Sequence, residues 1–232
     1  MTASPATSIV GISGPTCSGK TTLARRLQGA LPNVTLLHQD DFYLPPGNIP
    51  IDPATGMQDW DCDAAIDWPR LEAALAHFRA QGRLPVYRVT EPPTAADLRP
   101  DPTVVALAKE LRRDPVPATL IVDGFMLYHR PDVDRQFDRR LVVEADRATL
   151  EARRRDRTGY QTTEGWWTDP PGYFERIVWP NYLRHRAEVA ALPADHHLAL
   201  DSGCLDIPVL DAAAVRYVLT NSIGAPGEQV KR

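Results

Sequence analysis

Residues 14–21 read Gly-Pro-Thr-Cys-Ser-Gly-Lys-Thr, which is the G-x-x-x-x-G-K-T spacing of a phosphate-binding P-loop. The glycines let the main chain bend so that several N–H groups point inward at phosphate oxygens. Lys20 places a positive charge against the β- and γ-phosphates, and the Thr21 hydroxyl is a natural ligand for Mg²⁺. We therefore predict nucleotide-phosphate contacts from this stretch, at Gly14, Thr16, Cys17, Ser18, Gly19, Lys20, Thr21 and Thr22.

The residues around the motif predict the elements that such a loop needs. Residues 8–13 are a short apolar, β-branched run, as expected of a buried parallel strand. Apolar residues then recur at helical spacing from Lys20 to about Leu31, so the helix N-terminus would add its dipole to the phosphate site. The alternative interpretation is a glycine-rich turn between two core elements.

Acidic side chains follow two further predicted strands. Asp40 and Asp41 follow the strand predicted at 34–38, and Asp123 ends the apolar run at 119–124. Ligands of open α/β sheets bind outside the carboxyl ends of the strands, where these acids lie. On an extended chain end, adjacent side chains point opposite ways, so we expect only one of the aspartate pair to face a substrate. An Asx turn is the alternative for that pair. Asp123 resembles the Walker B acid that supports Mg²⁺, and an ordinary buried strand is its alternative.

An aromatic residue and a basic cluster complete the candidate chemistry. Trp60 lies between Asp59 and Asp61, which favours a partly wet stacking platform for a flat ring over a dry core position. The predicted helix at 148–157 carries a cluster of arginines, at Arg153, Arg154, Arg155 and Arg157. Such a cluster is either a solvated face or a lid that closes on phosphates. Residues 159–173 hold aromatics, prolines and glycines and predict a mobile loop.

Composition limits the function classes. The chain has 232 residues, 43% of them apolar and 24% charged, with a formal net charge of −4. This balance argues against a general binder of nucleic acid or of anionic membranes. There is no apolar run long enough to span a membrane, and residues 1–7 lack the features of a signal sequence. The three cysteines form no C-x-x-C, which favours a reducing compartment. We expect the cytoplasm, with the nucleus left open as a second location.

The pattern as a whole predicts one three-layer α/β domain over residues 1–232, with a parallel sheet of about five strands and helices on both faces. The remaining strands are expected at 84–89, 140–144 and 198–201. The remaining helices are expected at 64–80, 103–113, 175–191 and 207–219. We expect disorder at 1–7 and 224–232, a surface excursion at 91–117 and a lid region at 153–173.

With these residues assembled, the chain resembles the nicotinamide riboside kinases, within the uridine kinase-like branch of P-loop kinases. The matching segments are 11–14, 17–24, 39–42, 60–61, 122–125, 153–155, 160–161, 171–174 and 178–180. The P-loop is common to the whole branch. The Gln-Asp-Asp-Phe segment at 39–42 and the Pro-Gly-Tyr-Phe and Val-Trp-Pro segments near 171–180 are more specific.

The resemblance implies roles for particular residues. Asp40 would be the general base and a metal or ribose contact, alongside Thr21 and Asp123 as metal ligands. Trp60 would stack on the nicotinamide ring, with Tyr160 on its other face. The remaining nucleoside contacts implied are Asp41, Phe42, Tyr43, Asp61 and Arg155, and the remaining ATP contacts are Arg154, Arg157 and Ser202.

The sequence departs from the family pattern in several places. Residue 60 is Trp where we expect Tyr in the animal enzymes, and the Walker-type acid is Asp123 where we expect Glu. Arg157 is one place away from the expected second lid arginine. Residues 162–168 are additional, as in fungal members, and 91–117 aligns poorly.

The expected reaction is therefore phosphoryl transfer from Mg-ATP to the 5′-hydroxyl of nicotinamide riboside, by a monomer that acts on small molecules. A kinase of uridine or another nucleoside is the nearest alternative. It would surround the base with hydrogen-bonding side chains, whereas a cationic pyridinium favours aromatic faces and nearby acids. A P-loop switch or interaction module is an alternative of another class, and it would need no second substrate pocket.

Overall fold

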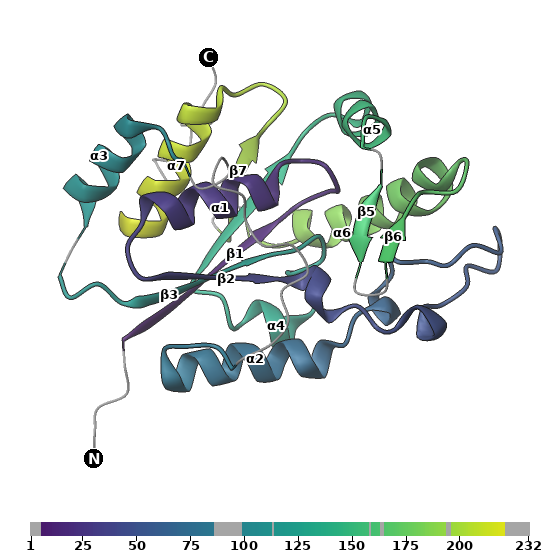
Figure 1. Cartoon of the computed structure of the whole chain (residues 1–232), viewed down its shortest axis with the longest axis horizontal. Helices are drawn as coiled ribbons and strands as arrows, with labels where there is room; N and C mark the ends of the chain where they lie inside the picture. The colour runs from purple at the N-terminus through teal and green to yellow at the C-terminus, as the bar shows by residue number, and fades with distance from the viewer. Residues whose placement is uncertain are drawn as a thin grey trace.

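The centre of the computed structural model is a five-stranded parallel sheet in the order β2-β3-β1-β4-β7 (Figure 1). The structure describes residues 6–85, 99–112, 114–157, 159–162, 165–193 and 196–220. The strands of this sheet are β1 (Thr7–Ser13), β2 (Val34–His38), β3 (Ala118–Asp123), β4 (Arg139–Glu144) and β7 (Leu198–Asp201). These five match the strands predicted from the apolar runs, and the fold is an α/β fold with a parallel sheet, as expected.

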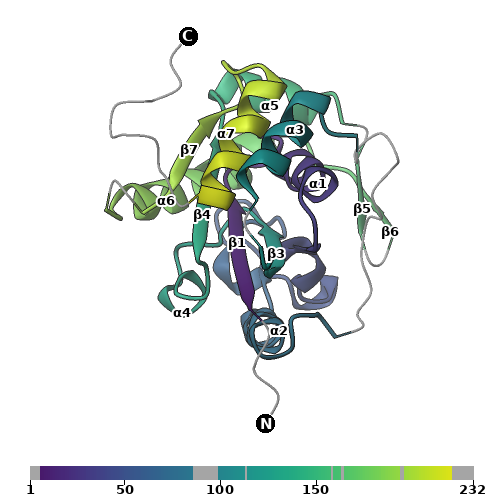
Figure 2. The same cartoon turned by 90° about the vertical axis from the view of Figure 1, so that its left-hand side faces the viewer.

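The central strands are apolar on both faces because helices cover both sides of the sheet. Along β3, Leu120 and Val122 join one core cluster and Ile121 joins the other. Helices α1 (Lys20–Ala30), α3 (Pro102–Leu111) and α7 (Ile207–Thr220) lie on one face, as Figure 1 and Figure 2 show. Helices α2 (Trp68–Gln81) and α4 (Pro131–Asp134) lie on the other. This three-layer arrangement leaves the carboxyl edge of the sheet as the place for a site.

The register of the strands brings the chemically active residues to that edge. His38, the last residue of β2, lies opposite Asp123, the last residue of β3. The loop that follows β1 leads directly into α1, whose N-cap is Gly19. Helix α5 (Arg147–Arg155) begins near the same edge after β4, and the Asp146 side chain caps it by accepting a hydrogen bond from the Thr149 N–H.

A smaller group of elements stands beside this edge. Two short antiparallel strands, β5 (Tyr160–Thr162) and β6 (Gly165–Trp167), follow α5. A π-helical turn, η4 (Phe174–Val178), then runs directly into α6 (Trp179–Ala190). The helix expected at 175–191 is present despite Pro180, and the wide turn before the proline accommodates its ring and its missing N–H.

Four expectations are changed or left open by the structure. The loop predicted at 159–173 contains the β5–β6 hairpin. The surface excursion predicted at 91–117 includes residues that belong to the core, because α3 packs on α7 with Val104 and Ala108 buried. The strand expected at 84–89 lies mostly outside the described residues, as do nearly all of the two termini for which disorder was expected. Within the described part of the chain, no helix has both the length and the apolar character needed to cross a bilayer.

Candidate active site

A cavity of about 670 Å³ opens at the carboxyl edge of the sheet. The P-loop and the start of α1 line one end of it, with side chains from α5 above them. Aromatic and acidic residues from four other segments line the opposite end. We call these two parts the phosphate end and the nucleoside end.

The main chain of the P-loop is shaped by residues in the left-handed region. Cys17 has φ 58° and Gly19 has φ 93°, and this alternation turns successive N–H groups toward one concavity. Gly14, at φ 143°, has no room for a side chain, because an added Cβ would lie 2.1 Å from the carbonyl oxygen of Val143. The hydroxyl of Ser18 is fully buried and has no hydrogen-bond partner among the described residues. The conformation of the loop is therefore that of an anion-binding cradle.

Lys20 extends along this cradle. Its Nζ donates a hydrogen bond to the carbonyl oxygen of Pro15 at 2.6 Å. Burial lowers the pKa of the Lys20 ammonium, although the nearby carboxylates of Asp123 and Asp40 act in the opposite direction. A phosphate oxygen is a stronger acceptor for this ammonium than the neutral carbonyl that it contacts here.

Asp123 is the centre of a buried polar cluster at the floor of the phosphate end. It accepts a hydrogen bond from the Thr21 hydroxyl at 2.5 Å, and its second oxygen is hydrogen-bonded to Nδ1 of His38. Burial would raise the pKa of Asp123, but the hydrogen bond and charge of His38, together with Thr21 and Lys20, hold it below its usual value. For His38, burial acts to lower the pKa and Asp123 outweighs it, so this pKa is raised. Sequence reasoning missed His38, although its place at the end of the strand beside β3 could have indicated it.

The adjacent acids Asp40 and Asp41 do not continue β2 as an extended chain. They belong to a 3₁₀ turn, η1 (Gln39–Phe42), so the predicted alternation of side chains was wrong, and both residues line the cavity. Asp41 is only 6% exposed, whereas Asp40 opens to the cavity. Loss of hydration, followed by the charge of Asp123, raises the pKa of Asp40 to about 6, while Lys20 acts to lower it.

The nucleoside end is walled by aromatic rings from separate segments. The Trp60 ring centroid lies 5.3 Å from that of Tyr43 and 5.6 Å from that of Trp167. Tyr43 also stacks on Phe125, with centroids 6.0 Å apart and an interplanar angle of 25°. The hydroxyl of Tyr173 accepts a hydrogen bond from the Trp60 N–H, which holds this segment against η4. Flat rings facing one space can bind a planar base.

Acidic residues lie directly beside these rings. Burial raises the pKa of Asp61 to about 7, the charges of Asp59 and Asp169 add to this effect, and Arg154 opposes it. Asp59 is itself buried and accepts hydrogen bonds from the side-chain amide of Asn181 at 3.0 and 3.2 Å. A cationic ring placed here would find both aromatic faces and negative charge.

The arginines of α5 differ in what they contact. Arg154 makes a bidentate pair with Asp169 at 2.6 and 3.0 Å and donates to the Thr16 hydroxyl at 2.8 Å. Arg153 donates to Ser202 and to the Cys17 carbonyl, which ties α5 to the P-loop. Guanidinium groups match phosphate oxygens in geometry as well as in charge, so this helix can close over a nucleotide.

Comparison with known proteins is consistent with a site that binds phosphates at one end and a planar ring at the other. No family model matches the chain. The nicotinamide riboside kinase of Schizosaccharomyces pombe is 39% identical over 184 residues, which cover 76% of this chain and 78% of that protein. The nicotinamide riboside kinase of Eremothecium gossypii is 38% identical over 190 residues, covering 79% and 77%. Human nicotinamide riboside kinase 1 is 32% identical over 183 residues, covering 79% and 78%.

The chain belongs to the nicotinamide riboside kinase family. Most of the residues predicted for the site, from the P-loop spacing or from the resemblance, line the cavity, namely Thr16, Cys17, Ser18, Gly19, Lys20, Thr21, Thr22, Asp40, Asp41, Tyr43, Trp60, Asp61, Asp123, Arg154, Arg157 and Ser202. Gly14 and Phe42 are buried behind its wall, and Arg155 is exposed outside it. The side chain of Tyr160 lies outside the described residues. Besides His38, sequence reasoning assigned no site role to Trp167 or Tyr173, which line the cavity together with Arg153 of the predicted arginine cluster.

The residues at the phosphate end fit a Mg²⁺ ion of the kind that this kinase family uses with ATP. Mg²⁺ prefers oxygen ligands and is usually held by one or two carboxylates together with substrate phosphates. The Thr21 hydroxyl, the Asp123 carboxylate and the Asp40 carboxylate supply such oxygens on one wall of the cavity. The Thr21 hydroxyl and the Asp123 carboxylate are hydrogen-bonded to each other, so their oxygens lie close enough to bind the same ion.

Proposed function

We propose that the chain transfers the γ-phosphoryl group of ATP to the 5′-hydroxyl of nicotinamide riboside, giving the mononucleotide used in NAD salvage. The observation that carries this proposal is the continuity of one cavity from a P-loop to an aromatic and acidic pocket. A nucleotide-binding switch has no need of the second pocket. The family membership and the chemistry of the two ends support the same reaction.

The residues at the phosphate end would position and neutralise the transferring group. In the reaction, the bond between the γ-phosphorus and the β,γ-bridging oxygen breaks and a bond to the 5′-oxygen forms. Lys20 and the loop amides hold the β- and γ-phosphates, and Arg154 approaches the same group from α5. Mg²⁺ bound by Thr21, Asp123 and Asp40 would neutralise charge on the phosphates.

Asp40 would act as the base for the substrate hydroxyl. Its carboxylate opens into the cavity between the phosphate and nucleoside ends, where the 5′-hydroxyl must meet the γ-phosphate. A positioned carboxylate in hydrogen-bond reach suffices to accept or orient this proton. Its pKa of about 6 keeps most of the group ionised at neutral pH.

The nucleoside end would select the pyridinium ring. Trp60 and Trp167 offer ring faces, and Asp61 offers a carboxylate to the ribose hydroxyls and to the cationic ring. We further propose Tyr160, Asp41, Phe42, Tyr43 and Arg155 as additional nucleoside contacts, and Arg157 and Ser202 as additional ATP contacts. We also propose that the chain acts as a monomer on small molecules, in the cytoplasm.

A panel of nucleosides with Mg-ATP tests the proposal directly. The purified full chain is assayed for ADP release with nicotinamide riboside, nicotinic acid riboside, uridine, cytidine and adenosine. We expect the highest kcat/KM with nicotinamide riboside. Preferred turnover of uridine would favour the pyrimidine kinase alternative, and no turnover of any nucleoside would contradict a kinase function.

A further inference from the structure

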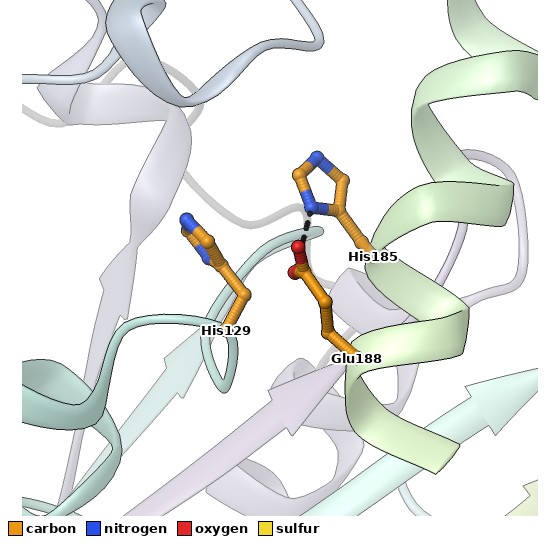
Figure 3. Close-up of side chains that lie close together, drawn as sticks. All are labelled: His129, His185 and Glu188. Atoms are coloured by element: carbon orange, nitrogen blue, oxygen red, sulfur yellow. Dashed lines mark ion pairs between the residues drawn. The ribbon is translucent and has the colours of Figure 1, made fainter. Parts of the chain in front are cut away.

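A second cavity, of about 500 Å³, lies behind the wall that carries Trp60 and Asp61. Three possible metal ligands converge there, and one ligand atom from each lies within 4.8 Å of the others. As Figure 3 shows, His185 and Glu188 project from α6, and His129 faces them from the segment that follows β3. None of these three residues lines the active-site cavity.

The hydrogen bonds of His185 leave one ring nitrogen available. Its Nε2 lies 3.3 Å from the carbonyl oxygen of Asp61, which can only accept, so the proton belongs on Nε2. Nδ1 is then a lone-pair donor, and it is buried without a hydrogen-bond partner among the described residues.

The position of Glu188 matches what a metal would require. Its Oε2 lies 3.5 Å from Nδ1 of His185. Two ligands bound to tetrahedral Zn²⁺ at about 2.1 Å are separated by about 3.4 Å. With Nδ1 protonated this contact is the ion pair drawn in Figure 3, and a divalent cation held between the two atoms would take the place of that proton. The i,i+3 spacing keeps both ligands on one face of α6.

His129 is oriented in the manner of a metal-binding histidine. Its Nδ1 donates to the carbonyl oxygen of Met126 at 2.9 Å, and its Nε2 faces the carboxylate of Asp63, with which it forms an ion pair when protonated; a bound metal would displace that proton. Asp63 lies 2.7 Å from that Nε2 and can serve as a further ligand or a hydrogen-bonding neighbour. Three carboxylates and two guanidinium groups line this cavity, and Asp63 is shared between His129 and Arg130.

We propose that His129, His185 and Glu188 form a binding site for a zinc-like divalent transition metal, distinct from the Mg²⁺ site of the kinase reaction. Two imidazoles and a carboxylate suit Zn²⁺ and its neighbours, whereas Mg²⁺ prefers oxygen ligands alone. Three protein ligands leave a fourth position for water from the adjoining cavity. The bound metal would join α6 to the segment after β3, next to the carbonyl of Asp61.

Calorimetry on the untagged full chain tests this site. The protein is treated with EDTA, dialysed and titrated with Zn²⁺, without nucleotide and with an excess of Mg²⁺ to occupy the kinase acids. We expect one Zn²⁺ per chain and a rise in the melting temperature of the loaded protein. Absence of stoichiometric binding would overturn the proposal and leave the three residues as an ordinary ion-paired cluster.

Variants at the exposed end of the site distinguish Zn²⁺ binding at these residues from Zn²⁺ binding by other carboxylates. Glu188 is 52% exposed, so Glu188→Gln should fold normally and bind Zn²⁺ about tenfold more weakly or worse. Glu175→Gln, at an exposed position just before α6, is the matched control and should bind like the wild type. The double variant Glu188→Gln with His129→Asn should lose the visible bands of bound Co²⁺ and the gain in melting temperature. Equal Zn²⁺ affinity in the wild type, Glu188→Gln and the double variant would place the metal elsewhere and refute the assignment.

Discussion

The two ends of the active-site cavity are built in different ways. The phosphate end is formed mainly by one continuous segment, in which strand β1, residues 14–19 and helix α1 follow one another. Its most important groups are main-chain amides and the helix terminus, whose positions follow from backbone conformation. The nucleoside end is assembled from side chains that are far apart in the sequence, including Tyr43, Trp60, Phe125 and Trp167. Its shape therefore depends on how α6, η4 and the hairpin pack.

The two ends also differ in charge. Lys20, Arg153 and Arg154 line the phosphate end, whereas Asp61 lies at the nucleoside end with Asp59 behind it. A substrate pair with anionic phosphates on one side and a cationic ring on the other would be oriented by this field alone. Asp40 lies where the two ends meet, and its pKa is raised to about 6 by loss of hydration and then by Asp123, while Lys20 acts to lower it. The predictions below test each end separately.

The largest effect is expected at the phosphate end. Lys20→Ala should lower kcat about 10³-fold, because this charge stabilises the transferring phosphoryl group. Among the described residues, the Lys20 ammonium donates its hydrogen bond to Pro15 of its own loop, so the fold should persist. Steady-state kinetics and circular dichroism on the same preparation check both parts. A folded variant with near-normal kcat would overturn the phosphoryl-transfer mechanism.

The next effect is expected at the junction of the two ends. Asp40→Asn keeps the shape of the side chain but loses proton acceptance, so kcat should fall about 10²-fold while ATP binding is largely retained. Asp41→Asn is the matched control and should be milder. Kinetics with nicotinamide riboside and Mg-ATP, repeated over a range of Mg²⁺ concentrations, separate a base from a metal ligand. A dead Asp41→Asn enzyme beside a nearly normal Asp40→Asn enzyme would reverse the assignment of the base.

The difference between the ends explains how far the sequence could be interpreted. The continuous apolar runs of β1 and β3 and the P-loop spacing are features of local sequence, so the sheet, the phosphate end and the role of Lys20 were predictable. The turn at Asp40 and Asp41 was not, because a 3₁₀ turn and an extended strand end have the same residue types here. Trp167 and Tyr173 owe their places to tertiary contacts, such as the hydrogen bond between the Tyr173 hydroxyl and the Trp60 N–H. No local pattern carries that information.

The aromatic wall of the nucleoside end should act on binding. Trp60→Ala should raise KM for nicotinamide riboside about tenfold or more, on the scale of a lost base–aromatic stacking contact, with KM for ATP unchanged. Trp60→Phe keeps a flat face and should recover most of the affinity. An equal rise in the KM of both substrates would mean that the substitution had disturbed the whole cavity instead.

The acidic part of the nucleoside end predicts a pH dependence. Asp61 has a pKa of about 7, so it is mostly neutral below that pH and ionised above it. A cationic ring binds the ionised form better, so kcat/KM for nicotinamide riboside should rise severalfold as pH increases through about 7. Asp61→Asn should remove this step, and a nucleoside with an uncharged ring, which keeps only the ribose contact to Asp61, should show a smaller one. With either nucleoside, kcat/KM should still show the separate change at about pH 6 that is due to Asp40. The same pH profile in Asp61→Asn and in the wild type would exclude Asp61 as its cause.

The smallest effect is expected at the arginine helix, where adjacent residues differ in exposure. Arg154 is held between Asp169 and Thr16, whereas Arg155 is exposed outside the cavity lining. Arg155→Ala should therefore raise KM for the nucleoside only about two- to fivefold, the scale of an exposed charged contact. Arg154→Ala should cost more and should act on kcat, because its guanidinium approaches the phosphates. The measurement is a full kinetic comparison of the two variants with both substrates varied. A larger loss of kcat/KM in Arg155→Ala than in Arg154→Ala would contradict this order. It would mean that α5 turns on ligand binding so that Arg155 enters the cavity. The phosphate end would then change conformation more than its continuous backbone implies.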